Sequence, residues 1–178
     1  EGLYQVQVEC LSQDEGDHYD PATNTVRLSY GNYNRATVTA VGVAAHECGH
    51  AIQHAKEYAP LNFRTALVPF VNIGSTVGMP LILLGVLLSW NMVFIQIGIW
   101  AFSLSVIFQL VTLPVEFNAS ARAVEKVEEY GLLTQEEKQG CRKVLSAAAM
   151  TYVAATAASA MQLLRLILLF GGNRRRRD

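Results

Sequence analysis

The sequence predicts a mainly α-helical integral membrane protein with about three transmembrane helices and a small β-hairpin or sheet. Apolar residues make up 51% of its 178 residues and charged residues only 16%, whereas soluble domains carry about 25% charged residues. Residues 65–115 contain no charged residue and no histidine. Because one bilayer crossing needs about 20 apolar residues, this stretch is long enough for two crossings and a turn.

The membrane helices can be placed from the polar residues beside them. We expect the first two at residues 66–88 and 92–113, joined by a polar turn with an interfacial tryptophan at residues 89–91. A third uncharged stretch, interrupted by Arg165, predicts a membrane helix at about residues 148–170. A helical hairpin buried in a soluble core is the alternative, but soluble helices need a polar face.

The polar parts of the chain predict the remaining elements. Residues 4–9 and 25–29 alternate between apolar and polar side chains, as half-buried strands do. We expect residues 31–34 to form a loop and residues 35–55 to form a helix. Another helix should begin at Glu116 and end before Gly131.

The pattern H-E-C-G-H at residues 46–50 carries the chemistry. Residues four apart share one face of a helix, so His46 and His50 can both reach a single Zn²⁺. Glu47 lies beside that face and can reach a water molecule instead of the metal. Cys48 should point away from the metal as a small buried residue. The motif therefore predicts a zinc-dependent peptidase with a zincin-like core and one Zn²⁺ per chain.

Catalytic zinc sites usually have three protein ligands and one open position. His54 lies about 12 Å along the helix from His46, which is too far for one ion to bridge. The longer H-E-x-x-H-x-x-G-x-x-H pattern is absent, because residue 53 is Gln and residue 56 is Lys. Glu116 is the better candidate, because a two-crossing hairpin returns it to the membrane face where the His-containing helix ends. The alternative for Glu116 is a helix-start glutamate favoured by the helix dipole.

With this ligand set, Glu47 would act as general base in peptide-bond hydrolysis. Arg122, His18 and Tyr152 are candidates for stabilising the oxyanion, and the sequence does not choose among them. Residues 25–29 could bind an extended substrate by adding it as a strand.

The residues 1–178 are expected to form one membrane metallopeptidase domain. Its extramembrane catalytic parts should be residues 1–64 and 115–143. The third long helix should begin in water near residue 135, because Thr134 and Glu137 have the spacing of a capping box. We also expect a further segment upstream of Glu1.

The charges beside the membrane helices give two opposing indications of orientation. Lys56, Arg64, Arg122 and Lys126 flank the side of the site and favour the cytoplasm, whereas Arg174–Arg177 would then lie outside. On balance we expect the site on the cytoplasmic side.

Several segments resemble the YugP-like neutral zinc metallopeptidases of bacterial membranes: residues 17–21 (DHYDP), 43–54 (VAAHECGHAIQH), 58–61 (YAPL), 113–120 (LPVEFNAS) and 151–154 (TYVA). The resemblance covers most of the chain. It implies a multi-pass protein of the bacterial cytoplasmic (inner) membrane, with His46, His50 and Glu116 on zinc in the gluzincin manner and Glu47 as base.

A more distant likeness joins the chain to HtpX-type and CAAX prenyl endopeptidases. Those proteins carry the glutamate ligand in a Glu-x-x-x-Asp pattern, in which the Asp orients a ligand histidine. The fifth position here is Ser120, which is a departure, and so is Asn118, where YugP-like members often have Asp.

The function is therefore predicted to be endopeptidase action on peptides or membrane proteins in a lipid bilayer. The alternative is a catalytically silent, zinc-containing membrane scaffold or partner-binding subunit, although a scaffold would have no use for Glu47. A transporter would rest on Arg165 alone. A homo-oligomer or a partner membrane protein is compatible with the sequence. The net charge of −1 predicts no general attraction to nucleic acid.

Overall fold

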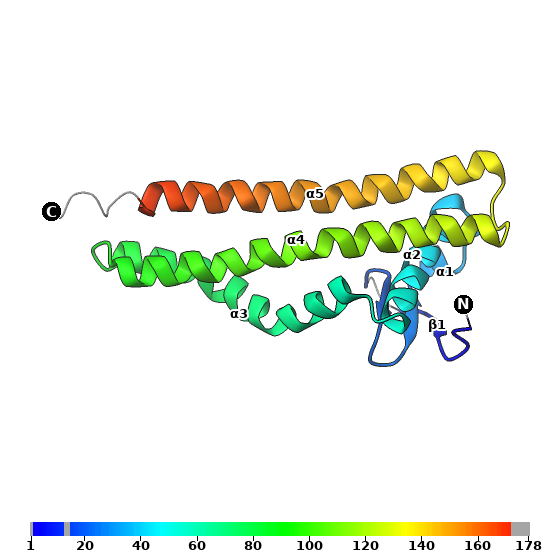
Figure 1. Ribbon diagram of the computed structural model, residues 1–178, viewed down its shortest axis with the longest axis horizontal. Coiled ribbons are helices and arrows are strands. Elements are labelled where there is room, and N and C mark those ends of the chain that lie inside the picture. Colours follow the sequence, from blue (N-terminus) through cyan, green and yellow to red (C-terminus); the bar gives the residue numbers. More distant parts are fainter. Residues whose placement is uncertain (1, 13–14, 172–178) are drawn as a thin grey trace. The chain divides into compact units, whose positions relative to one another are not determined.

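The computed structural model describes residues 2–12 and 15–171. The elements in chain order are β1 (Gln7–Cys10), β2 (His18–Asp20), β3 (Thr25–Leu28), α1 (Tyr30–Tyr33), α2 (Val38–Ala55), α3 (Ala59–Leu87), α4 (Met92–Glu129) and α5 (Gln135–Gly171) (Figure 1). They form two compact units. The first joins Glu1–Asn62 to Pro114–Thr151, and the second joins Phe63–Leu113 to Tyr152–Asp178.

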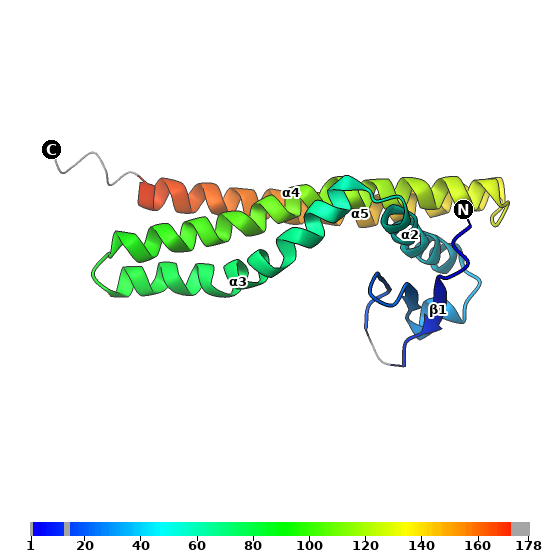
Figure 2. The same ribbon diagram turned by 60° about the horizontal axis from the view of Figure 1, so that its bottom comes forward.

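The first unit contains a three-stranded sheet of order β1-β3-β2. Strand β3 pairs in parallel with β1 and antiparallel with β2, and the sheet packs against α2 (Figure 2). The predicted small sheet is confirmed, but its strand at residues 25–29 is central and paired on both sides. It therefore has no free edge for a substrate strand, and that expectation was wrong. The sequence did not reveal the pairing of β3 with β2, because β2 is too short to show an alternating pattern.

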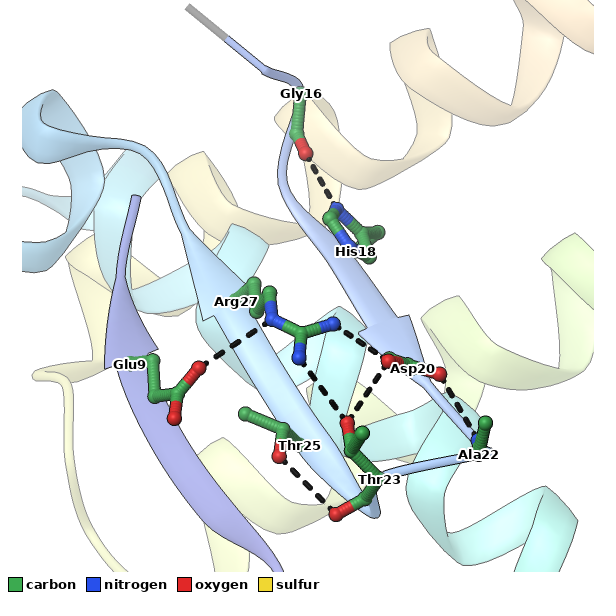
Figure 3. Close-up of polar contacts among 8 residues, drawn as sticks. All are labelled: Glu9, Gly16, His18, Asp20, Ala22, Thr23, Thr25 and Arg27. Atoms are coloured by element: carbon green, nitrogen blue, oxygen red, sulfur yellow. Dashed lines mark hydrogen bonds and ion pairs between the residues drawn. The ribbon is translucent and has the colours of Figure 1, made fainter. Parts of the chain in front are cut away.

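Arg27 connects all three strands across one face of the sheet (Figure 3). Its guanidinium lies 3.3 Å from Glu9 on β1 and 2.6 Å from Asp20 on β2, and it also donates to Thr23. The hydrogen bond from Arg27 lowers the pKa of the Asp20 carboxyl well below its usual range. The contacts hold the short edge strand β2 in place.

Helix α2 begins after Thr37, whose side chain accepts a hydrogen bond from the Ala40 amide. In the first unit it packs with α4 and α5 around a small core of Ala123, Cys141 and Leu145. The predicted helix at residues 35–55 is confirmed apart from its first turn. Residues 31–34 were expected to be a loop, but most of them form the single helical turn α1.

The second unit contains a helical hairpin in which α3 and α4 pack closely. The turn between them falls at Ser89 and Trp90, which both adopt left-handed backbone conformations. A Cβ added to Gly98 of α4 would lie only 2.6 Å from the carbonyl oxygen of Gly78 on α3, so the small residues permit this approach. Between α4 and α5, the Gln109 amide donates a hydrogen bond to Ser159.

Helices α3, α4 and α5 are each long and apolar enough to cross a membrane, which confirms the predicted fold class. Thr134 and Glu137 form the expected capping box at the start of α5. Arg174–Arg177 lie outside the described residues.

The expected helix start at Glu116 was wrong. Glu116 is the first charged residue after the uncharged run, which suggested a boundary there, but α4 continues through Pro114 to Glu129. A single proline removes one backbone hydrogen bond, and the bonds of the neighbouring turns maintain the helix. Glu116 is therefore not held near a helix N-terminus, and the alternative explanation through the helix dipole no longer applies.

Candidate metal centre

Helix α2 places the two motif histidines one turn apart on the same face. The rings of His46 and His50 lie 4.8 Å apart, with their planes nearly perpendicular. Both side chains are partly buried, at 16% and 13% exposed. Their Nε2 atoms face the same point.

Glu116 reaches that point from α4. Its carboxylate oxygen Oε2 lies 3.2 Å from His46 Nε2 and 3.7 Å from His50 Nε2. The residue is only 3% exposed, so the carboxylate is held away from bulk water beside the two imidazoles. One ligand atom from each of the three residues falls within 4.8 Å of the others, which is close enough to hold one metal ion.

The spacing of these atoms fits zinc. Nitrogen and oxygen ligands lie about 2.0–2.2 Å from zinc in a tetrahedral arrangement, which puts neighbouring ligand atoms about 3.3–3.6 Å apart. The two distances from Glu116 Oε2 bracket that range. Two imidazoles and a carboxylate are also a ligand set that catalytic zinc sites use, with a fourth position left open.

Each histidine has a hydrogen-bonding partner for its other ring nitrogen. His50 Nδ1 lies 3.0 Å from Gln53 Oε1, and His46 Nδ1 lies 3.1 Å from Ser120 Oγ. An amide oxygen can only accept, so this contact requires a proton on His50 Nδ1, and a neutral ring then has its lone pair on Nε2. Such outer partners orient the ligands of a metal site.

Glu47 lies next to the cluster but is not one of its three clustered residues. Its side chain is buried, at 7% exposed. Burial raises the pKa of its carboxyl, and the charges of His50 and His46 act in the opposite direction without cancelling the effect. Burial likewise opposes the charged form of His50, but the hydrogen bond and charge of Glu116 outweigh it and raise the pKa of His50.

The backbones of α2 and α4 approach closely at this site. A Cβ built on Gly49 would lie 2.6 Å from the carbonyl oxygen of Ala119. Gly49 stands between the two histidines, and Ala119 stands between Glu116 and Ser120. Glycine at this crossing therefore sets the distance between the two helices that carry the clustered residues.

The three candidates for stabilising the oxyanion are distributed over the chain. The Arg122 Nε–H donates to Asn118 at 2.8 Å, and the His18 Nδ1–H donates to the carbonyl of Gly16 at 2.8 Å. Tyr152 belongs to the second unit. None of the three is assigned to the oxyanion by these contacts, so that role stays a sequence-based prediction.

Two other residues of α2, His54 and Cys48, do not belong to the cluster. His54 is exposed and lies 3.0 Å from the Tyr19 hydroxyl, away from the clustered ligand atoms. Cys48 is exposed, so the expectation that it is buried was wrong, although its thiol is not among the clustered ligand atoms.

Sequence reasoning missed the roles of Gln53 and Ser120. Gln53 follows His50 by three residues, a spacing that places both on one helix face. That signal was present, but residue 53 was considered only as a position lacking a ligand. Ser120 was noted only as a departure from an aspartate pattern, yet its hydroxyl stands where that aspartate would orient His46.

Comparisons with known proteins agree with this geometry. The family model described as "Putative neutral zinc metallopeptidase" matches residues 1–171. The chain is also 48% identical over 154 residues to the "Putative membrane protease YugP" of Bacillus subtilis (strain 168), covering 86% of this chain and 68% of that protein. No solved structure matches the chain significantly. The chain therefore belongs to this zinc metallopeptidase family.

Proposed function

We propose that this chain is a membrane-embedded, zinc-dependent endopeptidase in which His46, His50 and Glu116 hold the metal and Glu47 is the general base. The observation that carries the proposal is the convergence of two imidazoles from α2 and a buried carboxylate from α4, with atom spacings that suit one zinc ion. A second carboxylate, Glu47, is buried beside them without joining the group.

Zinc bound at this site would supply a Lewis acid that polarises the scissile carbonyl and acidifies the attacking water. Glu47 then accepts a proton from that water and delivers it to the leaving amine. Its pKa is raised by burial, which makes its carboxylate a stronger base than an exposed glutamate. Removing the carboxylate while keeping its shape should therefore stop hydrolysis and leave metal binding intact.

The edge strand β2 is the natural place for an extended substrate. It packs against α2, and β3 occupies only one of its sides. A peptide added to the other side would satisfy the backbone groups of β2 and run beside the helix that carries the motif. We therefore assign to β2 the binding of an extended substrate strand, which the sequence suggested for residues 25–29.

The proposal includes a location. Residues 66–88, 92–113 and about 148–170 cross the bacterial cytoplasmic membrane, and residues 1–64 and 115–143 lie outside the bilayer on the cytoplasmic side. The substrates are then peptides or membrane proteins that expose an extended segment at the membrane surface.

The test compares wild type with Glu47→Gln in the full chain, purified in detergent or nanodiscs. The assays are metal content by mass spectrometry and cleavage of an unfolded protein such as casein. We expect about one zinc per chain in both proteins and loss of cleavage only in the variant. Glu125→Gln, an exposed glutamate on α4, is the matched control and should retain both properties.

The outcomes separate the enzyme from the scaffold. Wild type that binds zinc but cleaves nothing, or cleavage that continues unchanged in Glu47→Gln, would favour the catalytically silent scaffold. Wild type without zinc, with His46→Ala identical to it, would contradict the metal site itself.

A further inference from the structure

Gln53 is a completely buried polar residue, at 0% exposed. It lies on α2 one turn beyond His50. A buried amide is tolerated where each of its polar atoms has a hydrogen-bond partner, because an unsatisfied buried donor or acceptor destabilises the fold. All the hydrogen-bonding groups of this side chain are used, and they connect two ligand-bearing helices.

The amide oxygen serves the histidine. Gln53 Oε1 lies 3.0 Å from His50 Nδ1 and accepts a hydrogen bond from its N–H. The amide nitrogen serves α4. Gln53 Nε2 donates to the carbonyl oxygen of Val115 at 2.8 Å and to Asn118 Oδ1 at 3.0 Å.

These partners fix the orientation of the amide. Val115 presents a carbonyl oxygen, which can only accept, so the NH₂ group must face α4. The oxygen must then face His50. A rotated amide would oppose two oxygens at α4, so the hydrogen bonds on α4 determine which group meets the histidine.

The α4 partners flank the carboxylate ligand. Val115 precedes Glu116 and Asn118 follows it by two residues. Asn118 is itself held by the Nε–H of Arg122 at 2.8 Å. One side chain thus touches His50 directly and the backbone next to Glu116.

We propose that Gln53 is a positioning residue, which holds His50 in the tautomer that leaves Nε2 free for the metal and keeps His50 in register with Glu116. The inference rests on the proposed zinc site and adds a residue to it. Gln53 touches neither metal nor substrate. It acts through His50, so its loss should weaken metal binding and alter coordination geometry.

Two substitutions separate this role from simple packing. Gln53→Met keeps nearly the same volume and loses both hydrogen-bonding groups. Gln53→Glu keeps an oxygen that can accept from His50 Nδ1, but it loses the N–H donors to Val115 and Asn118 on α4. Gln139→Met, on an exposed position of α5, is the matched control.

The assays use the full chain in detergent. The first is the zinc dissociation constant by competition with a chromophoric chelator. The second is the visible spectrum of the Co²⁺-loaded protein, which reports the coordination geometry of the metal. Gln53→Met should bind zinc about 10- to 100-fold more weakly, the usual effect of losing an outer-shell partner, with a changed Co²⁺ spectrum. Gln53→Glu should retain more of the zinc affinity and a spectrum closer to wild type.

The results distinguish failure of this inference from failure of the proposed function. If wild type binds zinc and cleaves, but Gln53→Met has the same affinity and spectrum, the positioning role is refuted and the enzyme stands. If wild type binds no zinc, the proposed function fails first. Should Gln53→Met not fold, Gln53→Glu decides the matter, because it loses the hydrogen bonds to α4. Wild-type zinc affinity with an unchanged Co²⁺ spectrum overturns the role, and weaker binding with a changed spectrum supports it.

Discussion

Replacing Gly49 with alanine should weaken zinc binding by about 5- to 150-fold without unfolding the protein. The new Cβ would lie 2.6 Å from the Ala119 carbonyl oxygen, whereas carbon and oxygen approach each other to about 3.3 Å. The two helices must therefore separate by about 0.7 Å. Metal–ligand distances tolerate only about 0.2 Å, so His46 and His50 would be drawn away from Glu116.

Two free-energy effects oppose each other in this variant. Alanine favours the helix over glycine by about 1 kcal/mol, and overpacking costs about 1–3 kcal/mol. Without metal the helices can separate and avoid the overpacking, so the stability of the apo protein should change by no more than about 1 kcal/mol. Binding zinc requires the close approach again, so the overpacking cost then appears in the dissociation constant, at tenfold per 1.4 kcal/mol.

The assay is chelator competition for zinc, together with thermal unfolding with and without the metal. Gly140→Ala is the matched control, because its Cβ would meet only a Val38 methyl group at 3.4 Å, an ordinary contact. It should keep wild-type zinc affinity. Zinc binding by Gly49→Ala within twofold of wild type would refute the claim that this crossing sets the ligand geometry.

Two further outcomes are expected. Ser120→Ala removes the partner of His46 Nδ1 and should weaken zinc binding by about tenfold, measured by the same competition; an unchanged affinity would exclude a positioning role for the hydroxyl. Arg27→Met should destabilise the sheet in a pH-dependent manner. The hydrogen bond from Arg27 lowers the pKa of Asp20 from its usual 3.8, so the stabilisation is fully present above that value and is lost as the pH falls below it. The difference between wild type and Arg27→Met, measured by urea unfolding with chelator present, should therefore be largest near pH 7 and shrink below about pH 4. A difference that is constant with pH would contradict the ion-pair explanation.

Much of the fold was predictable because membrane helices follow directly from composition. The run without charge at residues 65–115 predicted two long helices, and the structure contains them. The spacing of His46 and His50 predicted a shared helix face, and the same run indicated that Glu116 would return to it. The structure brings the three side chains together, and their role as zinc ligands stays a proposal.

Other features depend on contacts that no local pattern reveals. The order of strands in a sheet is a property of the folded chain, so the central position of β3 was not visible. The helix through Pro114 and Glu116 depends on hydrogen bonds of neighbouring turns, which outweigh the local break that proline suggests. The partners of Gln53 belong to a helix more than 60 positions away, and only the crossing of α2 and α4 brings them together.

The outer partners of the two imidazoles are uncharged. His50 faces an amide oxygen and His46 faces a hydroxyl, whereas many zinc-binding histidines face a carboxylate that makes them more basic. Neutral partners leave each imidazole a weaker electron donor. A divalent cation held by this set would retain more of its positive charge. The neutrality of Gln53 and Ser120 would then favour a strongly electrophilic metal over the highest possible metal affinity.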